Sequence, residues 1–171
     1  MPVVCVNAAD SVKIAKPNQI SAPRPLMDGS GVFFVPYTSD GVITDWVDKG
    51  IQLDMGSNLG GLIGAELANQ VLSEIPVLGS MIGKSVGEYI GASAAISAIG
   101  GIDYIRSTSD QSFQKIEDLA VFLYARHASH KDYKKVLAIT IIVHPELEEI
   151  YYSAIVDASA DAFAFDIDLG D

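Results

Sequence analysis

The sequence contains little cysteine, few basic residues and no long hydrophobic segment. Its single cysteine, Cys5, has no partner for an internal disulfide, so nothing in the chain requires an oxidising compartment. The 171 residues include 11 Lys and Arg against 22 Asp and Glu, which gives a net charge of -11. Because this charge repels phosphate backbones, the composition argues against nucleic acid as a partner.

The sequence also lacks the patterns of a secretory signal and of a membrane-spanning helix. Its N-terminus, MPVVCVNAADSVKIAK, has no basic start followed by a continuous apolar stretch. The longest uncharged run extends from Tyr89 to Ile102, which is shorter than the roughly 20 residues that cross a bilayer. We therefore expect a cytoplasmic protein without a clear transmembrane span, with conditional membrane association as an alternative.

The residues that are present predict a folded protein with one core. Hydrophobic residues make up 49% of the chain and charged residues 19%, which is too apolar a composition for disorder. Residues 17–31, PNQISAPRPLMDGSG, contain three prolines and two glycines without apolar periodicity, so we expect an extended N-terminal arm over residues 1–31. Residues 32–171 are expected to form a single α+β domain.

Two regions carry strand signals. VFFVPY (32–37) and VITDWV (42–47) flank TSDG, in which Asp40 and Gly41 favour a turn, and together they predict a β-hairpin. AFAFDIDL (162–169) alternates strictly between apolar and polar residues, which is typical of a strand. The sequence thus predicts a small β-sheet made from the N-terminal hairpin and the C-terminal strand.

Helical periodicity predicts further helices. One is expected from about Ser112 to Arg126, capped by Asp110 or Ser112, after a connector at residues 102–110. DYKKVLAITIIVH (132–144) fits either a buried strand or a buried helix, and we favour the helix because it ends before Pro145. Another helix is expected from Pro145 to about Ala160, since proline is favoured at the first helical position.

The most distinctive feature is a glycine-rich pattern that occurs twice, in LGGLIGAELANQV (59–71) and LGSMIGKSVGEYI (78–90). Residues four apart lie on one ridge of an α-helix. In both copies an apolar ridge adjoins a ridge of small residues, and a third ridge is polar. The small ridges consist of Gly60, Gly64 and Ala68 in the first copy and of Gly79, Gly83, Gly87, Gly91 and Ala95 in the second. We expect a central antiparallel helical hairpin over residues 56–100, with its corner near Pro76.

Glycine in these rows is expected to serve close helix packing. Each helical glycine costs about 1 kcal/mol relative to alanine, so the four glycines from Gly79 to Gly91 cost about 4 kcal/mol. A ridge without side chains lets another backbone approach closely, and the dispersion attraction between the two helices can offset this cost. The two small ridges are therefore the predicted helix-packing and oligomer interface, within one chain or between chains.

GGLIGAELA (60–68) and GSMIGKSVGEYIG (79–91) resemble the motifs of the glycine-zipper helical-hairpin proteins, a loose class in which GxxxGxxxG helices pair. The resemblance covers about a quarter of the chain. It implies membrane association, pore formation or homo-oligomer packing. Against permanent insertion, charged residues occur inside the candidate helices, namely Glu66, Glu74, Lys84 and Glu88.

Signals for catalysis or cofactor binding are few. His127, His130, Asp132 and His144 have the residue types of a divalent metal site, but histidines that follow a helix end are more often caps or solvated residues, so we predict no metal. No serine or cysteine lies in a nucleophile motif, and the glycines match no nucleotide-binding loop. We therefore expect no catalytic residues and no cofactor.

The prediction for function is a non-enzymatic structural or scaffolding protein that forms homo-oligomers or larger assemblies through close helix packing. One alternative is a membrane-active protein whose hairpin inserts conditionally to form a pore. The other is a metal-dependent enzyme that uses His127, His130 and His144.

Overall fold

The computed structural model describes residues 12–55 and 90–168. In this part of the chain it contains one 3-10 helix, six α-helices and a two-stranded antiparallel sheet, so the α+β class is confirmed. The elements are η1 (Pro17–Gln19), β1 (Phe33–Phe34), α1 (Asp45–Gln52), α3 (Ile90–Ile99), α4 (Ile102–Ser107), β2 (Ser112–Phe113), α5 (Ile116–His127), α6 (Tyr133–Val143) and α7 (Glu146–Asp168).

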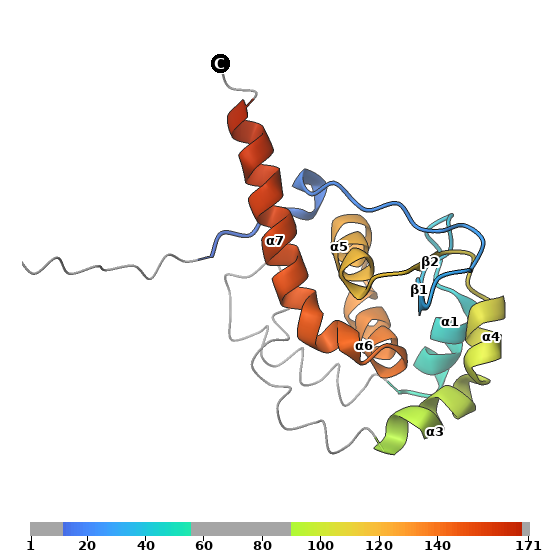
Figure 1. Cartoon of the computed structure of the whole chain (residues 1–171). Coiled ribbons are helices and arrows are strands. Elements are labelled where there is room, and N and C mark those ends of the chain that lie inside the picture. The colour runs from blue at the N-terminus through green and yellow to red at the C-terminus, as the bar shows by residue number, and fades with distance from the viewer. Residues whose placement is uncertain (1–11, 56–89, 169–171) are drawn as a thin grey trace, which may run out of the picture.

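Three helices, α5, α6 and α7, build the body of the molecule (Figure 1). Helix α5 packs along α7 and also contacts η1, whereas α6 contacts α1 and α3. The small sheet and α4 lie at the side of the body away from α7 (Figure 1). Helix α6 also contacts α7, so it connects the pair of α5 and α7 to α1 and α3.

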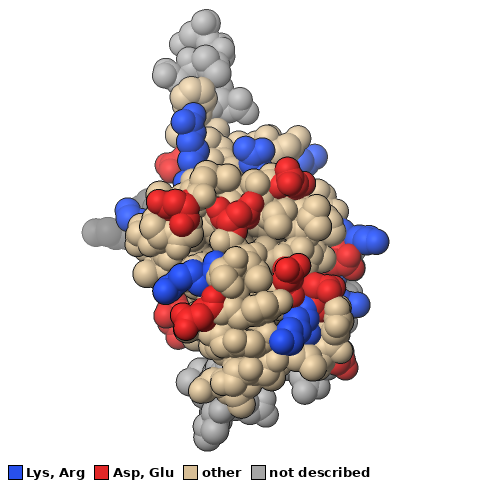
Figure 2. Space-filling view, turned by 90° about the vertical axis from the view of Figure 1, so that its right-hand side faces the viewer, with Lys and Arg blue, Asp and Glu red and all other residues tan. Residues whose placement is uncertain are grey.

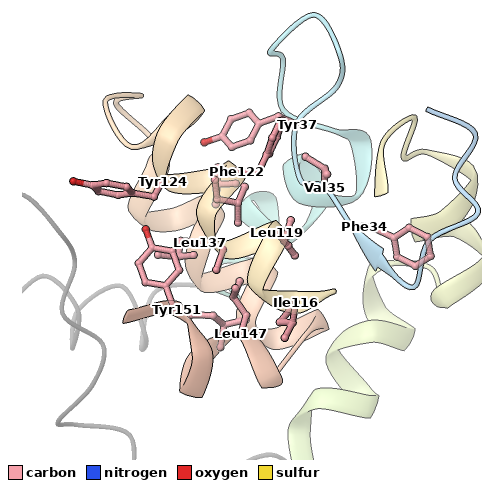
Figure 3. Close-up of a cluster of buried hydrophobic side chains, with 14 of the residues drawn as sticks. Phe34, Val35, Tyr37, Ile116, Leu119, Phe122, Tyr124, Leu137, Leu147 and Tyr151 are labelled. Carbon is pink, nitrogen blue, oxygen red and sulfur yellow. The ribbon is translucent and has the colours of Figure 1, made fainter. Parts of the chain in front are cut away.

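Helices α5 and α6 are buried on nearly all sides, which explains why their sequences lack a clear polar face. Every residue of α5 from Leu119 to Tyr124 is buried, as is every residue of α6 from Val136 to Val143. A helix that is apolar all round belongs in the middle of a core. Figure 3 shows part of this core, to which α5, α6 and α7 contribute Leu119, Leu137 and Tyr151. The helix favoured for residues 132–144 is confirmed by α6.

The predicted hairpin is half wrong. Its turn is present, because the backbone N–H of Thr38 donates to the Val42 carbonyl and Tyr37 forms an antiparallel bridge with Ile43. The second predicted strand instead becomes α1, which begins at Asp45 after Thr44. Since two carboxylates in the first turn favour a helix N-terminus, the acidic residues of this segment support the helix that formed.

The sheet partner of β1 is β2, with Phe33 opposite Phe113 and Phe34 opposite Ser112. This corrects two further predictions. Ser112 belongs to a strand, so α5 starts four residues later than expected, after Lys115, which forms no side-chain cap bond. The expected connector at residues 102–110 contains α4.

The predicted C-terminal strand is also wrong. Residues 162–168 continue α7, which runs for 23 residues from Glu146 to Asp168, whereas the prediction ended this helix near Ala160. The alternation in AFAFDIDL comes from the alanines and acidic residues that separate its larger apolar side chains. Strand preference depends strongly on packing partners, so a period-2 pattern alone did not decide the structure.

The arm from Val12 to Gly31 contains only the short η1 and lies against the body. The Ala15 backbone N–H donates to Ser159 Oγ of α7 at 3.0 Å, and its carbonyl accepts a bond from the Tyr124 hydroxyl of α5 at 2.9 Å. Ala15 is 1% exposed. The arm is therefore attached to both α5 and α7, and the division of the chain at residue 31 stays a prediction.

Candidate functional site

Most of the predicted helix-packing interface falls outside the described residues. Gly60, Gly64, Ala68, Gly79, Gly83 and Gly87 lie there, as does the hairpin apart from α3. Gly91 and Ala95 are in α3, where Ala95 is half-buried. The structure therefore describes this candidate interface only at its C-terminal end, on α3.

Helix α3 has one buried side and one exposed side. Ile99 is 0% exposed, and α3 contacts both α6 and α1. The opposite side exposes four small side chains, Ser93, Ala94, Ser97 and Ala98. No residue of α3 is charged, so this exposed side carries neither a charge nor a bulky group that would hold another helix away.

Glycine ends α3 and also permits a close helix contact nearby. Gly100 and Gly101 have φ values of 130° and 87°, and both donate their backbone N–H to the Ile96 carbonyl, which is a glycine C-terminal cap. In α1, a Cβ added to Gly50 would come within 2.9 Å of Ile139 Cγ2 in α6. Gly50 therefore shows, inside this protein, a helical glycine that allows a neighbouring helix to approach.

The first two histidines of the weak metal candidates lie against Tyr37. The His127 ring, in the last turn of α5, stacks on the Tyr37 ring with centroids 3.9 Å apart and planes 8° apart. The His130 ring meets the same ring edge-on at 5.6 Å, and its Nδ1 accepts a long 3.4 Å bond from the Asp132 N–H. Burial, together with His130 and Arg126, lowers the pKa of His127 to about 4.

His144 lies elsewhere, directly after α6 and before Pro145. The residue before a proline disfavours the helical conformation, and His144 adopts φ -125° and ψ 78°, which ends the helix. Its Nε2 accepts the Phe34 backbone N–H at 3.0 Å, and its ring contacts those of Phe33 and Phe34. Burial lowers the pKa of His144 to about 4.

Within residues 12–55 and 90–168, no three His, Cys, Asp or Glu side chains come together in a way that could hold a metal ion. His127 and His130 face Tyr37, whereas His144 faces β1. In the same part of the chain, no helix has the length and apolar character needed to cross a membrane.

A groove of about 580 Å³ lies between the arm and the C-terminal half of α7. Its lining includes Ile20 of the arm and Asp161, Ala162 and Phe163 of α7. The Lys13 ammonium lies 4.6 Å from the centre of the Phe163 ring. On another face, shown in Figure 2, acidic and basic side chains are interspersed without a large patch of either sign.

Sequence reasoning missed the contacts that link aromatic residues to histidines and to one another. The buried hydroxyls of Tyr133 in α6 and Tyr151 in α7 form a hydrogen bond, and burial raises the pKa of both phenols. The exposed side of α3 was also missed, although a signal exists for it. The apolar row of Leu78, Ile82, Val86 and Ile90 reaches Ala94 and Ala98 when it is continued in steps of four.

Comparison of the chain with protein-family models, with characterised proteins and with solved structures gave no significant match.

Proposed function

We propose that this protein is a non-enzymatic structural or scaffolding protein that assembles with copies of itself through close helix packing. The observation that carries the proposal is the surface of α3, an uncharged helix with Ser93, Ala94, Ser97 and Ala98 exposed. Small side chains let two helix axes approach, and no charge needs to be desolvated when they do.

The size of α3 indicates that the proposed contact extends further along the chain. Ten residues at a rise of 1.5 Å give a helix of about 15 Å, which is too short to bury the roughly 800 Å² per partner of a typical stable interface. The rows from Gly60 to Ala68 and from Gly79 to Ala95 are the segments that supply the rest. On α3 the exposed Ala94 and Ala98 continue the neighbouring row of Leu78, Ile82, Val86 and Ile90, so the proposed contact includes that row as well.

The proposal is tested by light scattering coupled to size exclusion, without detergent and at several concentrations. Wild-type protein is expected to give a discrete multimer or open-ended growth, and Ala98→Arg is expected to shift the mass towards the monomer. Ala160→Arg is the matched control, because Ala160 is also an exposed helical alanine, in α7. Circular dichroism verifies that both variants fold.

A monomeric wild type at every concentration would contradict self-assembly. A multimer that survives Ala98→Arg would contradict the α3 surface as its contact, and Gly83→Leu and Gly87→Leu would then test the glycine rows directly. The two alternatives, a membrane-inserting hairpin and a metal-dependent enzyme, stay hypotheses. Vesicle leakage at neutral and mildly acid pH tests the first, and elemental analysis tests the second.

A further inference from the structure

All three histidines of the chain contact one short segment, residues 33–37. His144 binds the backbone of Phe34 and contacts the rings of Phe33 and Phe34, whereas His127 and His130 contact the ring of Tyr37. The segment is itself deeply buried, because Phe34, Val35 and Tyr37 are at most 1% exposed. Figure 3 shows these three residues, with Phe34 set apart from Tyr37 along the segment.

The hydrogen bond of His144 exists only while its imidazole is neutral. Nε2 accepts the Phe34 N–H, so the single proton of the neutral ring lies on Nδ1. Protonation would turn Nε2 into a donor that faces another donor. His144 is 5% exposed, so little solvent is present to hydrate the imidazolium in place, and the ring must leave its position to become charged.

Among the described residues, one cation lies near the Phe34 ring that His144 contacts, and one buried acidic residue follows His144 in α7. The Arg106 guanidinium of α4 lies 5.7 Å from the centre of the Phe34 ring, whose surroundings His144 shares. Glu148, a buried residue of α7, lies four positions further along the chain. From β1 the rings of Phe33 and Phe34 face His144, and neither is titratable.

The surroundings of His127 oppose a charge on its ring. Tyr37 covers one side of the ring and Phe122 lies 5.5 Å away, centroid to centroid. His130 and Arg126 both disfavour its protonation. Asp132 is the nearby carboxylate that acts on Tyr37. His127 is only half-buried, so solvent screens part of this effect.

From these contacts we infer that the segment 33–37 is an acid-released element: protonation of His144, assisted by His127, detaches it from α5 and α6 while those helices stay folded. This inference goes beyond self-assembly and does not depend on it. Release would expose Phe34, Val35 and Tyr37, and it would free the end of the segment that leads through Pro36 and the turn to α1.

The direction of the pH dependence follows from the pKa of His144. Its folded pKa of about 4 lies below the ordinary value of 6.5, so the closed form is favoured above pH 6.5 and loses that advantage as the pH falls towards 4. For one site with these two values, the opening constant rises about 30-fold between pH 7.5 and pH 5. His127 adds a smaller factor in the same direction.

The test measures hydrogen exchange of the Phe34 amide by NMR, expressed as a protection factor at pH 7.5 and pH 5. We expect the factor to fall by about 30-fold or more in the wild type. His144→Gln keeps an acceptor for the Phe34 N–H but has no titratable ring, so its loss of protection should be smaller by about that factor. His127→Phe keeps an aromatic ring against Tyr37 but removes the ring that titrates. It therefore tests the contribution of the His127–Tyr37 contact in the same way.

Two results would overturn the inference. An equal loss of protection at the buried Leu137 amide of α6 would mean global acid unfolding, and a pH-independent Phe34 amide would mean that no release occurs. If His144→Gln fails to fold, the wild type still decides the question. The ¹⁵N shifts of His144 at pH 7.5 must show the Nδ1–H tautomer, and its titration midpoint must lie well below 6.5. The Nε2–H tautomer would contradict the bond from which the inference starts.

Discussion

Trp46 and Ser109 join α1 to the chain that follows α4 through a buried hydrogen bond. The indole Nε1–H donates to Ser109 Oγ at 2.9 Å, and the same hydroxyl donates to the Ile105 carbonyl at 2.7 Å. Trp46 is 0% exposed. A hydroxyl is one of the few groups that can accept from the indole and donate onward at once, so Ser109 satisfies two buried polar groups.

Ser109→Ala should lower the free energy of unfolding by about 1–3 kcal/mol, because it leaves the indole N–H buried without an acceptor. Urea unfolding followed by Trp46 fluorescence measures the change. Ser107→Ala is the control, since the Ser107 hydroxyl bonds to the Tyr104 carbonyl at an exposed position, and its effect should stay within about 0.5 kcal/mol. Equal effects of the two variants would contradict the role given to Ser109.

Ser159→Ala should loosen the N-terminal arm. Its Oγ is the acceptor for the Ala15 N–H and donates to the Ile155 carbonyl, so the variant should lose about 1 kcal/mol of stability. Limited trypsin digestion should then cleave faster after Lys13, an exposed residue followed by Ile14. Ser153→Ala is the control, because it removes an exposed α7 hydroxyl that donates to the Ile150 carbonyl. The rate at which trypsin cleaves the arm of this variant should match that of the wild type.

The two phenylalanines near the end of α7 should behave differently on truncation. In α7, Phe163 is half-buried beneath the Lys13 ammonium, whereas Phe165 is 72% exposed. Phe163→Ala should therefore cost about 1–2 kcal/mol, and Phe165→Ala less than about 0.5 kcal/mol. A strand would place both rings on one face, so similar losses in urea unfolding would argue against the helix.

The helices of the body were predictable where apolar residues are continuous or bounded by proline. Pro145 separates α6 from α7, and both helices begin close to where the sequence placed them. The errors occurred in short segments with strand propensity. Residues 42–47 and 162–168 have β-branched or alternating residues. The predicted partner of the first was the neighbouring segment 32–37, and that of the second was the distant N-terminal hairpin. In the structure β1 pairs with β2. Local propensity does not determine a pairing between segments so far apart in the chain.

Gly50→Ala tests whether helical glycine is required for close packing in this protein. Alanine gains about 1 kcal/mol in helix propensity, but its Cβ would meet Ile139 Cγ2 at 2.9 Å in the core, and overpacking costs about 1–3 kcal/mol. We expect net destabilisation of about 1 kcal/mol in thermal or urea unfolding. A stabilised variant would mean that Ile139 can move aside freely.

The candidate site was predictable only in part. Spacing alone identified the small rows that reach Gly91 and Ala95, but it did not identify which side of α3 is exposed. That side depends on Ile99 packing towards α6 and α1. The histidines were recognised as a group by their closeness in sequence, yet their roles come from β1 and Tyr37, about 90 to 110 positions earlier in the chain. Contacts of that range leave no signature in local spacing.

The attachment of the arm also sets an order for folding during synthesis. Ala15 is bound by Tyr124 and Ser159, which lie 109 and 144 positions later in the chain. At about 5–20 residues per second, a ribosome needs about 7–29 s to add the residues between Ala15 and Ser159. Throughout that time the nascent arm lacks the part of its docking surface that α7 supplies, so the apolar groups between the arm and α7 stay exposed to solvent until the last helix is made.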